Sequence, residues 1–175
     1  NEAEEKGSDL IIFPEMFLSG YQPLDLVNKP SFLQSIFFQV QNIAEQTKSL
    51  NIRILIGAPW RLDNKIYNAL ISIFKGSIKV VSKKSHLPNY DVFDEKRFFV
   101  SEDGLDLLDL GNVKIGFPIC EDAWQHAGLV PSDYSVDPIE QLSSFSIDGE
   151  TLKMSLNLSS SPYHIEKQDT RAEVA

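Results

Sequence analysis

The segment Asp9-Leu10-Ile11-Ile12-Phe13-Pro14-Glu15 decides the fold class. Its apolar run has the length of a short strand and lacks the alternation with polar residues that marks a half-exposed strand. A continuous apolar run of this kind is typical of strands that are buried on both faces in layered α/β proteins. Pro14 ends the run, so Glu15 is expected at the carboxyl end of the strand, where open α/β sheets place functional sites.

The segments that follow predict helices interleaved with strands. Apolar residues recur at three- and four-residue steps over residues 32–44, which predicts an amphipathic helix that Ser31 can cap. Residues 52–58 are typical of another buried strand. Lys75-Gly76-Ser77 is expected to join two strands, at residues 66–74 and 78–81, in a hairpin.

The second half of the chain continues this order. We expect two strands at residues 105–110 and 113–119 around a Gly111-Asn112 turn, a helix at 137–147 and a last strand at 154–158. The whole order predicts a layered α/β fold with a mixed sheet. Residues 1–7 are typical of a helix end stopped by glycine, and residues 166–175 of a helix that has just begun. We therefore expect the chain to be a segment of a longer polypeptide.

Composition narrows the possible functions. The 175 residues are 42% hydrophobic and 23% charged, which is typical of one globular domain or part of one. The net charge of −9 argues against a nucleic-acid partner, and no apolar run is long enough for a membrane-spanning helix. One cysteine excludes a disulfide framework and indicates a reducing, cytoplasmic compartment. Three scattered histidines and one cysteine predict no metal site.

Three residues that could carry chemistry each follow a predicted strand, namely Glu15, Lys84 and Cys120. Taken singly, they are more commonly a surface acid, a solvated lysine and a buried, inert thiol. Taken together, they offer a base for a thiol, a cation for an oxyanion and a nucleophile at a strand-to-helix elbow, where backbone N–H groups favour a thiolate. If the three strands are parallel neighbours, the side chains converge at one sheet edge.

Several motifs carry a resemblance to a known family. Phe13-Pro14-Glu15, Lys84-Ser85-His86-Leu87-Pro88 and Ile119-Cys120-Glu121-Asp122 resemble the Glu, Lys and Cys motifs of the nitrilase, or carbon–nitrogen hydrolase, superfamily, in the family's order. Residues 87–99, 120–124 and 157–164 resemble segments of one branch, the glutamine-dependent NAD(+) synthetases. The similarity runs from Glu15 to Lys167, whereas residues 125–152 match the family poorly.

The resemblance implies a nitrilase-like four-layer α-β-β-α sandwich with mixed sheets, incomplete at both ends. Residues 1–175 would form a partial glutaminase (glutamine amidotransferase) domain that releases ammonia from L-glutamine. A synthetase domain of the same polypeptide would use this ammonia to amidate deamido-NAD(+). ATP and Mg are implied for that absent domain, and no cofactor is implied for this one. A Ser-Gly-Gly-x-Asp-Ser pyrophosphate loop is missing from the sequence, as expected if the synthetase domain lies outside it.

The resemblance also implies roles for single residues. Cys120 would be the nucleophile that forms a thioester, Glu15 the general base and Lys84 the cation at the oxyanion. The residues that match the family's glutamine-binding positions are Tyr90, Ser161 and Lys167.

Two positions near these motifs carry expectations of their own. Asp91 replaces the family's glycine, and we expect a positive φ there, which Asp tolerates better than most residues. Glu95 is expected in a surface charge cluster, with a second active-site carboxylate as the alternative.

Two other functions stay open at this point. One is a free-standing nitrilase-family amidase that acts on another C–N substrate, and the other is a catalytically silent nitrilase-like domain that serves assembly. A downstream synthetase segment would exclude the first, and a reactive Cys120 would exclude the second. For partners we expect L-glutamine, the synthetase domain and further copies of the chain in a homo-oligomer, with neither nucleic acid nor a membrane.

Overall fold

The structure is a computed structural model of residues 1–175. It describes residues 2–103, 107–111, 113–130, 134–144, 146–147, 150–151, 154–162, 165 and 167–174. Parts of the predicted segments lie outside these residues, namely Asn1, Leu105, Asp106, Asn112, Phe145, Tyr163, His164, Glu166 and Ala175.

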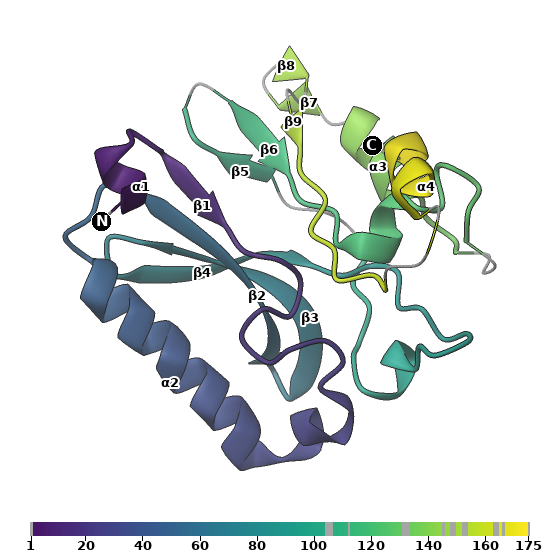
Figure 1. Cartoon of the computed structure of the whole chain (residues 1–175), viewed down its shortest axis with the longest axis horizontal. Coiled ribbons are helices and arrows are strands. Elements are labelled where there is room, and N and C mark those ends of the chain that lie inside the picture. Colours follow the sequence, from purple (N-terminus) through teal and green to yellow (C-terminus); the bar gives the residue numbers. More distant parts are fainter. Residues whose placement is uncertain are drawn as a thin grey trace.

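The larger sheet has the strand order β1-β2-β3-β4, with β1 (Leu10–Ile12) parallel to β2 (Arg53–Leu62) and the other pairs antiparallel (Figure 1). β3 (Lys65–Phe74) and β4 (Ser77–Lys83) form the predicted hairpin, which is therefore confirmed. Both of its turn residues, Lys75 and Gly76, have positive φ, as a two-residue hairpin turn requires. Asp63 and Asn64 form a second turn of this kind between β2 and β3, which the sequence analysis missed.

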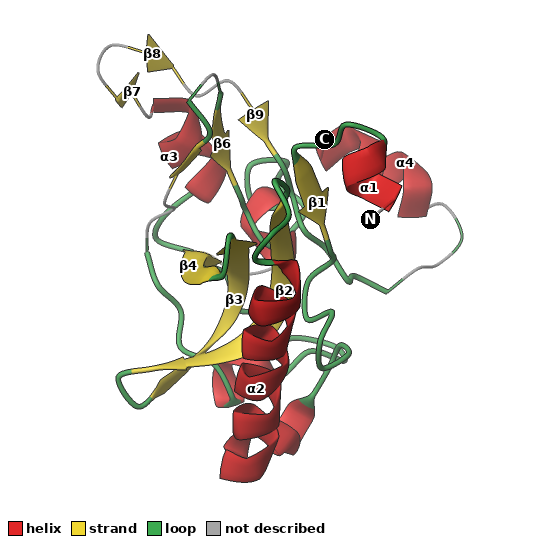
Figure 2. Ribbon diagram, turned by 90° about the vertical axis from the view of Figure 1, so that its left-hand side faces the viewer, coloured by secondary structure: helices red, strands yellow, loops and turns green. Residues whose placement is uncertain are grey.

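One long helix, α2 (Pro30–Thr47), covers one face of this sheet (Figure 2). Its buried stripe contains Ile36, Val40 and Ala44, which belong to one apolar cluster with side chains of β2 and β3. The predicted amphipathic helix is confirmed, but the predicted cap by Ser31 is wrong. Lys29 is the N-cap and Pro30 is the first helical residue, a position where the ring presets φ and the missing N–H costs nothing.

A smaller sheet packs on the other face. It contains β5 (Leu107–Asp109), β6 (Lys114–Gly116) and β9 (Met154–Ser155), with β6 and β9 parallel. The two sheets share a second apolar cluster, Leu55, Leu70, Val81, Leu108, Ile115, Phe117, Ile119, Cys120 and Leu158. Ile115 faces this cluster, so its neighbour Gly116 faces outward, where Leu142 of α3 (Pro138–Ser144) lies against it. The layers are therefore helix, sheet, sheet and helix, as the resemblance implies.

Short elements complete the chain. They are α1 (Glu2–Glu5), the 3₁₀ helices η1 (Leu24–Asn28), η2 (Glu95–Arg97) and η3 (Cys120–Ala123), the strand pair β7 (Ser146–Ile147) and β8 (Glu150–Thr151), and α4 (Lys167–Val174).

The helical ends expected at residues 1–7 and 166–175 are thus confirmed as α1 and α4. The helix expected over 137–147 is shorter than predicted, because Ser146 and Ile147 pair with β8 instead. No helix in the described part of the chain is long and apolar enough to cross a membrane.

The deciding strand β1 differs from its prediction in one respect. Within the described residues it pairs with β2 alone and lies at the edge of the sheet, and Ile12 is 38% exposed. The prediction of a strand buried on both faces was therefore wrong. The run is apolar because Leu10 packs against the core between the sheets while Phe13 packs against the α2 core.

Gly57 of β2 leaves no room for a side chain beside the end of β1. A Cβ at this position would overlap Pro14 O and lie 2.7 Å from Met16 N and 2.8 Å from Glu15 Cα. These are backbone atoms, which cannot move aside as a flexible side chain can. The close approach of the two strands therefore fixes where the Glu15 side chain begins.

We expect Gly57→Ala to destabilise the fold by about 3 kcal/mol, at the upper end of the cost of overpacking. Gly111→Ala is the control, because Gly111 has a φ of +85° but open space around its Cβ position. That change should cost only about 1–2 kcal/mol of left-handed backbone strain. Urea unfolding of both variants measures the difference. Equal costs would contradict the close approach.

Candidate active site

The carboxyl ends of three strands bring Glu15, Lys84 and Cys120 together. Glu15 follows β1 and Lys84 follows β4, which lie at opposite edges of the larger sheet but run in the same direction. Cys120 comes from the smaller sheet, just after β6. The three strands are therefore not parallel neighbours, which was the condition for their side chains to converge at one sheet edge. The three side chains meet between the two sheets, because sheet packing rather than strand pairing joins them.

Glu15 and Lys84 form a fully buried ion pair. Lys84 Nζ lies 2.9 Å from Glu15 Oε1, and neither side chain has exposed surface. Asn68 Nδ2 donates to the same oxygen at 2.7 Å, and the Ser160 N–H donates to Glu15 Oε2 at 2.9 Å. Oε1 thus accepts from two donors and Oε2 from one. Oε2 keeps a lone pair that could take up a proton.

Glu95 is a second carboxylate in this cluster. Its Oε1 lies 2.8 Å from Lys84 Nζ and accepts a hydrogen bond from the Tyr21 hydroxyl at 2.9 Å. Glu95 is 3% exposed, so the prediction of a surface cluster was wrong. The 3₁₀ turn η2 explains the difference, because it leaves Lys96 and Arg97 in solvent while turning Glu95 inward.

The shared ammonium sets the charges of the cluster. Burial lowers the pKa of Lys84, but the charges of Glu15 and Glu95 together raise it by more. The pKa of Lys84 therefore lies well above its ordinary value, and Lys84 stays charged. Burial also raises the pKa of Glu95, against the lowering effect of Lys84. Two carboxyl groups therefore share one ammonium, and burial of Glu95 opposes its charged form while Lys84 supports it.

Cys120 stands at the predicted elbow. Its φ is +50°, a left-handed conformation that is uncommon for any residue but glycine, and it opens η3. Burial first, and then the negative charge of Glu15, raise the pKa of its thiol to about 12, against the lowering effect of Lys84. The Cys120 N–H is taken by Leu158 O at 2.7 Å and Asn157 Oδ1 at 2.9 Å. The expected help from this backbone N–H is therefore absent, and the resting group is a thiol.

Two residues that the sequence analysis missed hold the elbow in place. Asn157 accepts from the Cys120 N–H and donates its Nδ2 to Cys120 O at 3.2 Å, which fixes both sides of the strained residue. Asp122 is fully buried, and its carboxylate accepts the N–H groups of Ser85, His86 and Ile119 at 2.7–3.0 Å. It ties the segment after Lys84 to the segment before Cys120. Both residues lay in motifs already quoted, but a motif does not reveal backbone partners.

A pocket of about 380 Å³ opens beside Cys120. It contains all three residues predicted to bind substrate, Tyr90, Ser161 and Lys167. The rest of its lining is Pro88, Asp91, Val92, Phe93, Cys120, Glu121, Trp124, Leu129 and Pro162. Asp91 has a φ of +52°, which confirms the expected left-handed conformation at the position of the family's glycine.

The pocket carries opposite charges on its walls. Lys167 Nζ lies 4.0 Å from the centre of the Trp124 ring. Glu121, which the sequence analysis did not choose as a binding residue, is 5% exposed and accepts the Tyr90 hydroxyl at 2.9 Å on both oxygens. Ser161 is held in place by Arg171, which donates to Ser161 O at 2.9 Å and to its Oγ at 3.1 Å. A small molecule with both an anionic and a cationic group fits this arrangement.

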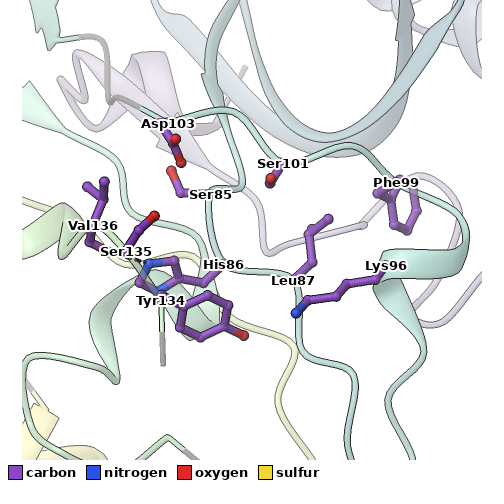
Figure 3. A pocket seen from close by; sticks show the side chains of 10 residues that line it. All are labelled: Ser85, His86, Leu87, Lys96, Phe99, Ser101, Asp103, Tyr134, Ser135 and Val136. Atoms are coloured by element: carbon purple, nitrogen blue, oxygen red, sulfur yellow. Dashed lines mark hydrogen bonds between the residues drawn. The ribbon is translucent and has the colours of Figure 1, made fainter. Parts of the chain in front are cut away.

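A second pocket, of about 370 Å³, shares no lining residue with the first (Figure 3). The His86 ring stacks on the Tyr134 ring along its wall, with ring centres 3.8 Å apart. The Tyr134 hydroxyl lies 3.4 Å from Glu121 Oε1, which places this ring between the two pockets. Of Glu15, Lys84 and Cys120, the first pocket is lined by Cys120, whereas the second is lined by none of them. The described residues contain no cluster of His, Cys, Asp and Glu suited to a metal ion.

We expect Lys84→Met to destabilise the fold by about 3–5 kcal/mol, because it leaves two buried carboxyl groups without their cation. Burial already raises the pKa of Glu95, and in this variant the lowering effect of Lys84 is lost, so the folded-state pKa of Glu95 lies above the unfolded-state value. Its stability is therefore greatest at acidic pH and is lost as the pH rises through the raised pKa. Urea unfolding at pH 5 and pH 8 should show a larger deficit at pH 8.

Lys83→Met is the matched control, since Lys83 pairs with the half-exposed Glu102 near the surface. Its cost should stay below about 1 kcal/mol and change little with pH. A larger loss for Lys83→Met than for Lys84→Met would contradict the assignment.

Comparison with known proteins places this site in a family. Residues 1–132 match the sequence profile of the carbon-nitrogen hydrolases. The chain is 40% identical over 171 residues to the glutamine-dependent NAD(+) synthetase of Thermotoga maritima, a match that covers 98% of this chain and 27% of that protein. The corresponding enzyme of Synechocystis is 36% identical over 178 residues, which cover 97% of this chain and 31% of that protein.

Solved structures agree with the sequence matches. The glutamine-dependent NAD+ synthetase of Acinetobacter baumannii superposes with a TM-score of 0.78 at 31% identity, over 98% of this chain and 29% of that one. A CN-hydrolase superfamily protein of Xanthomonas campestris, with a TM-score of 0.66 at 16% identity over 95% of this chain and 57% of that one, shows the fold alone. The chain thus spans less than a third of the length of the curated relatives in these comparisons. With the profile match over most of its length and the layered α/β fold, the chain belongs to the carbon–nitrogen hydrolase family.

Proposed function

We propose that this chain is the glutaminase part of a glutamine-dependent NAD(+) synthetase and releases ammonia from L-glutamine. The observation that carries the proposal is the buried Lys84 ammonium between Glu15 and Glu95, beside Cys120 at a pocket with charges of both signs. The names of the relatives support the choice of glutamine as substrate.

The first step is attack by the Cys120 sulfur on the side-chain carbonyl carbon of glutamine. The thiol proton passes to Glu15, whose Oε2 keeps accepting capacity, as the S–C bond forms and the carbonyl oxygen becomes an oxyanion. The Lys84 ammonium has three N–H donors, of which two serve Glu15 and Glu95. The third is left for the oxyanion, which the full positive charge stabilises.

The second step breaks the C–N bond and then restores the enzyme. Collapse of the oxyanion expels the amide nitrogen, which takes the proton held by Glu15 and leaves as ammonia. A thioester between Cys120 and the glutamyl group remains. Glu15 then takes a proton from a water molecule that attacks the thioester, and the Cys120 sulfur leaves with that proton as glutamate forms.

The charged walls of the pocket suit the two ends of the amino-acid group. The Lys167 ammonium and the Ser161 hydroxyl offer partners for an α-carboxylate, while Glu121 offers a carboxylate for an α-ammonium. Tyr90 orients that carboxylate through its hydroxyl. A simple amide would make no ion pair with Lys167 or Glu121, which favours glutamine over aliphatic amides.

The fate of the ammonia extends the proposal to the whole polypeptide. Residues 1–175 correspond to 27–31% of the length of the curated relatives. We place the ATP- and Mg-dependent amidation of deamido-NAD(+) in a separate synthetase domain of the same polypeptide.

We expect Cys120→Ser to lower glutamine-driven NAD(+) synthesis by the full-length polypeptide at least about 10³-fold, because a hydroxyl is a far weaker acid and nucleophile here than a thiol. Synthesis from free ammonia should continue at close to the wild-type rate, since that route bypasses Cys120. Ammonia release and NAD(+) formation measure the two routes. Glutamine turnover near the wild-type rate in this variant would exclude Cys120 as the nucleophile.

We expect Lys167→Ala and Glu121→Gln each to raise KM for glutamine about tenfold or more, since loss of one partner of a charged hydrogen bond costs about 1.5–3 kcal/mol. Gln168→Ala, an exposed neighbour on α4, is the control and should leave KM unchanged. Ammonia-driven synthesis should be close to wild type in all three. Faster turnover of simple aliphatic amides than of glutamine by the wild type would instead favour a general amidase.

A further inference from the structure

A serine hydroxyl contacts the nucleophile. Ser159 Oγ lies 3.4 Å from Cys120 Sγ and donates a hydrogen bond to it. This distance is normal for a hydrogen bond to sulfur, which is larger than oxygen. Ser159 lies between Asn157, which holds the Cys120 peptide, and Ser160, whose N–H holds Glu15. No role has been given to this hydroxyl so far.

The surroundings of Ser159 leave its hydrogen available for the sulfur. A hydroxyl has one hydrogen to donate and two lone pairs to accept with. The Ser161 N–H donates to one lone pair of Ser159 Oγ at 3.2 Å, so this contact does not use the hydrogen. The hydrogen of the hydroxyl is then free to point at the sulfur. The hydroxyl therefore acts as a donor toward Cys120.

The sulfur needs such a donor. Burial and the charge of Glu15 both oppose a negative sulfur. The Cys120 N–H is taken by Leu158 and Asn157, and Lys84 is engaged by its two carboxylates. Ser159 supplies a short-range partner that none of these groups supplies.

We propose that Ser159 is a catalytic residue whose hydroxyl donates to the Cys120 sulfur and stabilises its negative charge. The charge develops when the thiol proton moves to Glu15 during attack, and again when the sulfur leaves in thioester hydrolysis. The proton of Ser159 stays on its oxygen throughout, so the hydroxyl contributes a hydrogen bond and no proton. The inference rests on the proposed role of Cys120 as nucleophile.

The geometry suits this role because Ser159 has little freedom. Ser160 Oγ also donates to Glu15 O at 2.8 Å, so the segment is attached to the end of β1. Asn157 attaches it to the elbow on the other side. The hydroxyl, the nucleophile and the base are thus placed by consecutive residues of one segment, and a donor held in this way costs little reorganisation during the reaction.

The test compares Ser159→Ala with the isosteric pair Ser159→Thr and Ser159→Val in the full-length polypeptide. Alkylation of Cys120 by iodoacetamide, followed by peptide mass spectrometry, reports the thiolate directly and needs no substrate. We expect Ser159→Ala and Ser159→Val to slow alkylation about tenfold at each pH between 7 and 9, and Ser159→Thr to keep a near-wild-type rate. The rate should rise tenfold per pH unit in all of them, since the thiol remains mostly protonated in this range.

Steady-state kinetics give a second readout. We expect kcat for glutamine to fall about 10- to 100-fold in Ser159→Ala with KM changed less than threefold, and ammonia-driven synthesis to stay unchanged. Ser143→Ala is the control, because its exposed hydroxyl bonds within α3 and does not line the pocket. Thermal unfolding tests whether each variant is folded. If Ser159→Ala does not fold, the comparison of Ser159→Thr with Ser159→Val tests the role of the hydroxyl.

Wild-type alkylation rates and wild-type kcat in Ser159→Ala and Ser159→Val would overturn the proposal. So would equal losses in the Thr and Val variants, because a structural role depends on shape and not on the hydroxyl. These results would overturn the role of Ser159 without overturning the proposed function. The proposed function itself would fail if Cys120→Ser kept its glutamine turnover.

Discussion

The buried ammonium of Lys84 is the group on which the rest of the structure depends. Removing an ammonium from water is costly, and this one is stable because Glu15 and Glu95 lie 2.9 and 2.8 Å away. The three side chains come from the end of β1, the end of β4 and the turn η2, so none of them is paired until the sheet and the loop have formed. The requirement to pair this charge explains why Glu95 turns inward.

The charges of this cluster have opposite effects on the ionisation of Cys120. Burial and then the negative charge of Glu15 raise the pKa of the Cys120 thiol, while Lys84 and the Ser159 hydroxyl favour the thiolate. A permanent thiolate would need no base, but it would also be open to oxidation and to any electrophile. A thiol beside a carboxylate that can take its proton becomes nucleophilic only as a carbonyl is attacked. In the mechanism that we propose, the two carboxylates around one ammonium would thus link the reactivity of Cys120 to the arrival of substrate.

Local sequence patterns predicted most of the elements and only part of the site. The α2 helix and the β3–β4 hairpin follow from periodicity and turn residues within a few positions, so they could be predicted. The edge position of β1 could not, because an apolar run does not specify its neighbours. Glu95 was misjudged because charged neighbours suggest a surface, whereas burial is decided by the distant Lys84. Asn157, Asp122 and Ser159 contact residues that lie 36 to 39 positions away in the sequence, and no spacing rule reveals these contacts.

The layout of charges also bears on how the site distinguishes its substrate. The cluster of Glu15, Lys84 and Glu95 lies in a dry interior, whereas Lys167 and Glu121 line the open pocket next to Cys120. A ligand that pairs with both pocket charges carries the two charges of an amino acid, and its side chain is then directed toward the thiol. In the proposed function, binding of such a ligand would displace water from the pocket beside Cys120, which would strengthen the electrostatic interactions there. An amide without those charges gains neither orientation nor desolvation, so recognition at the pocket wall and catalysis at the sulfur draw on the same binding energy.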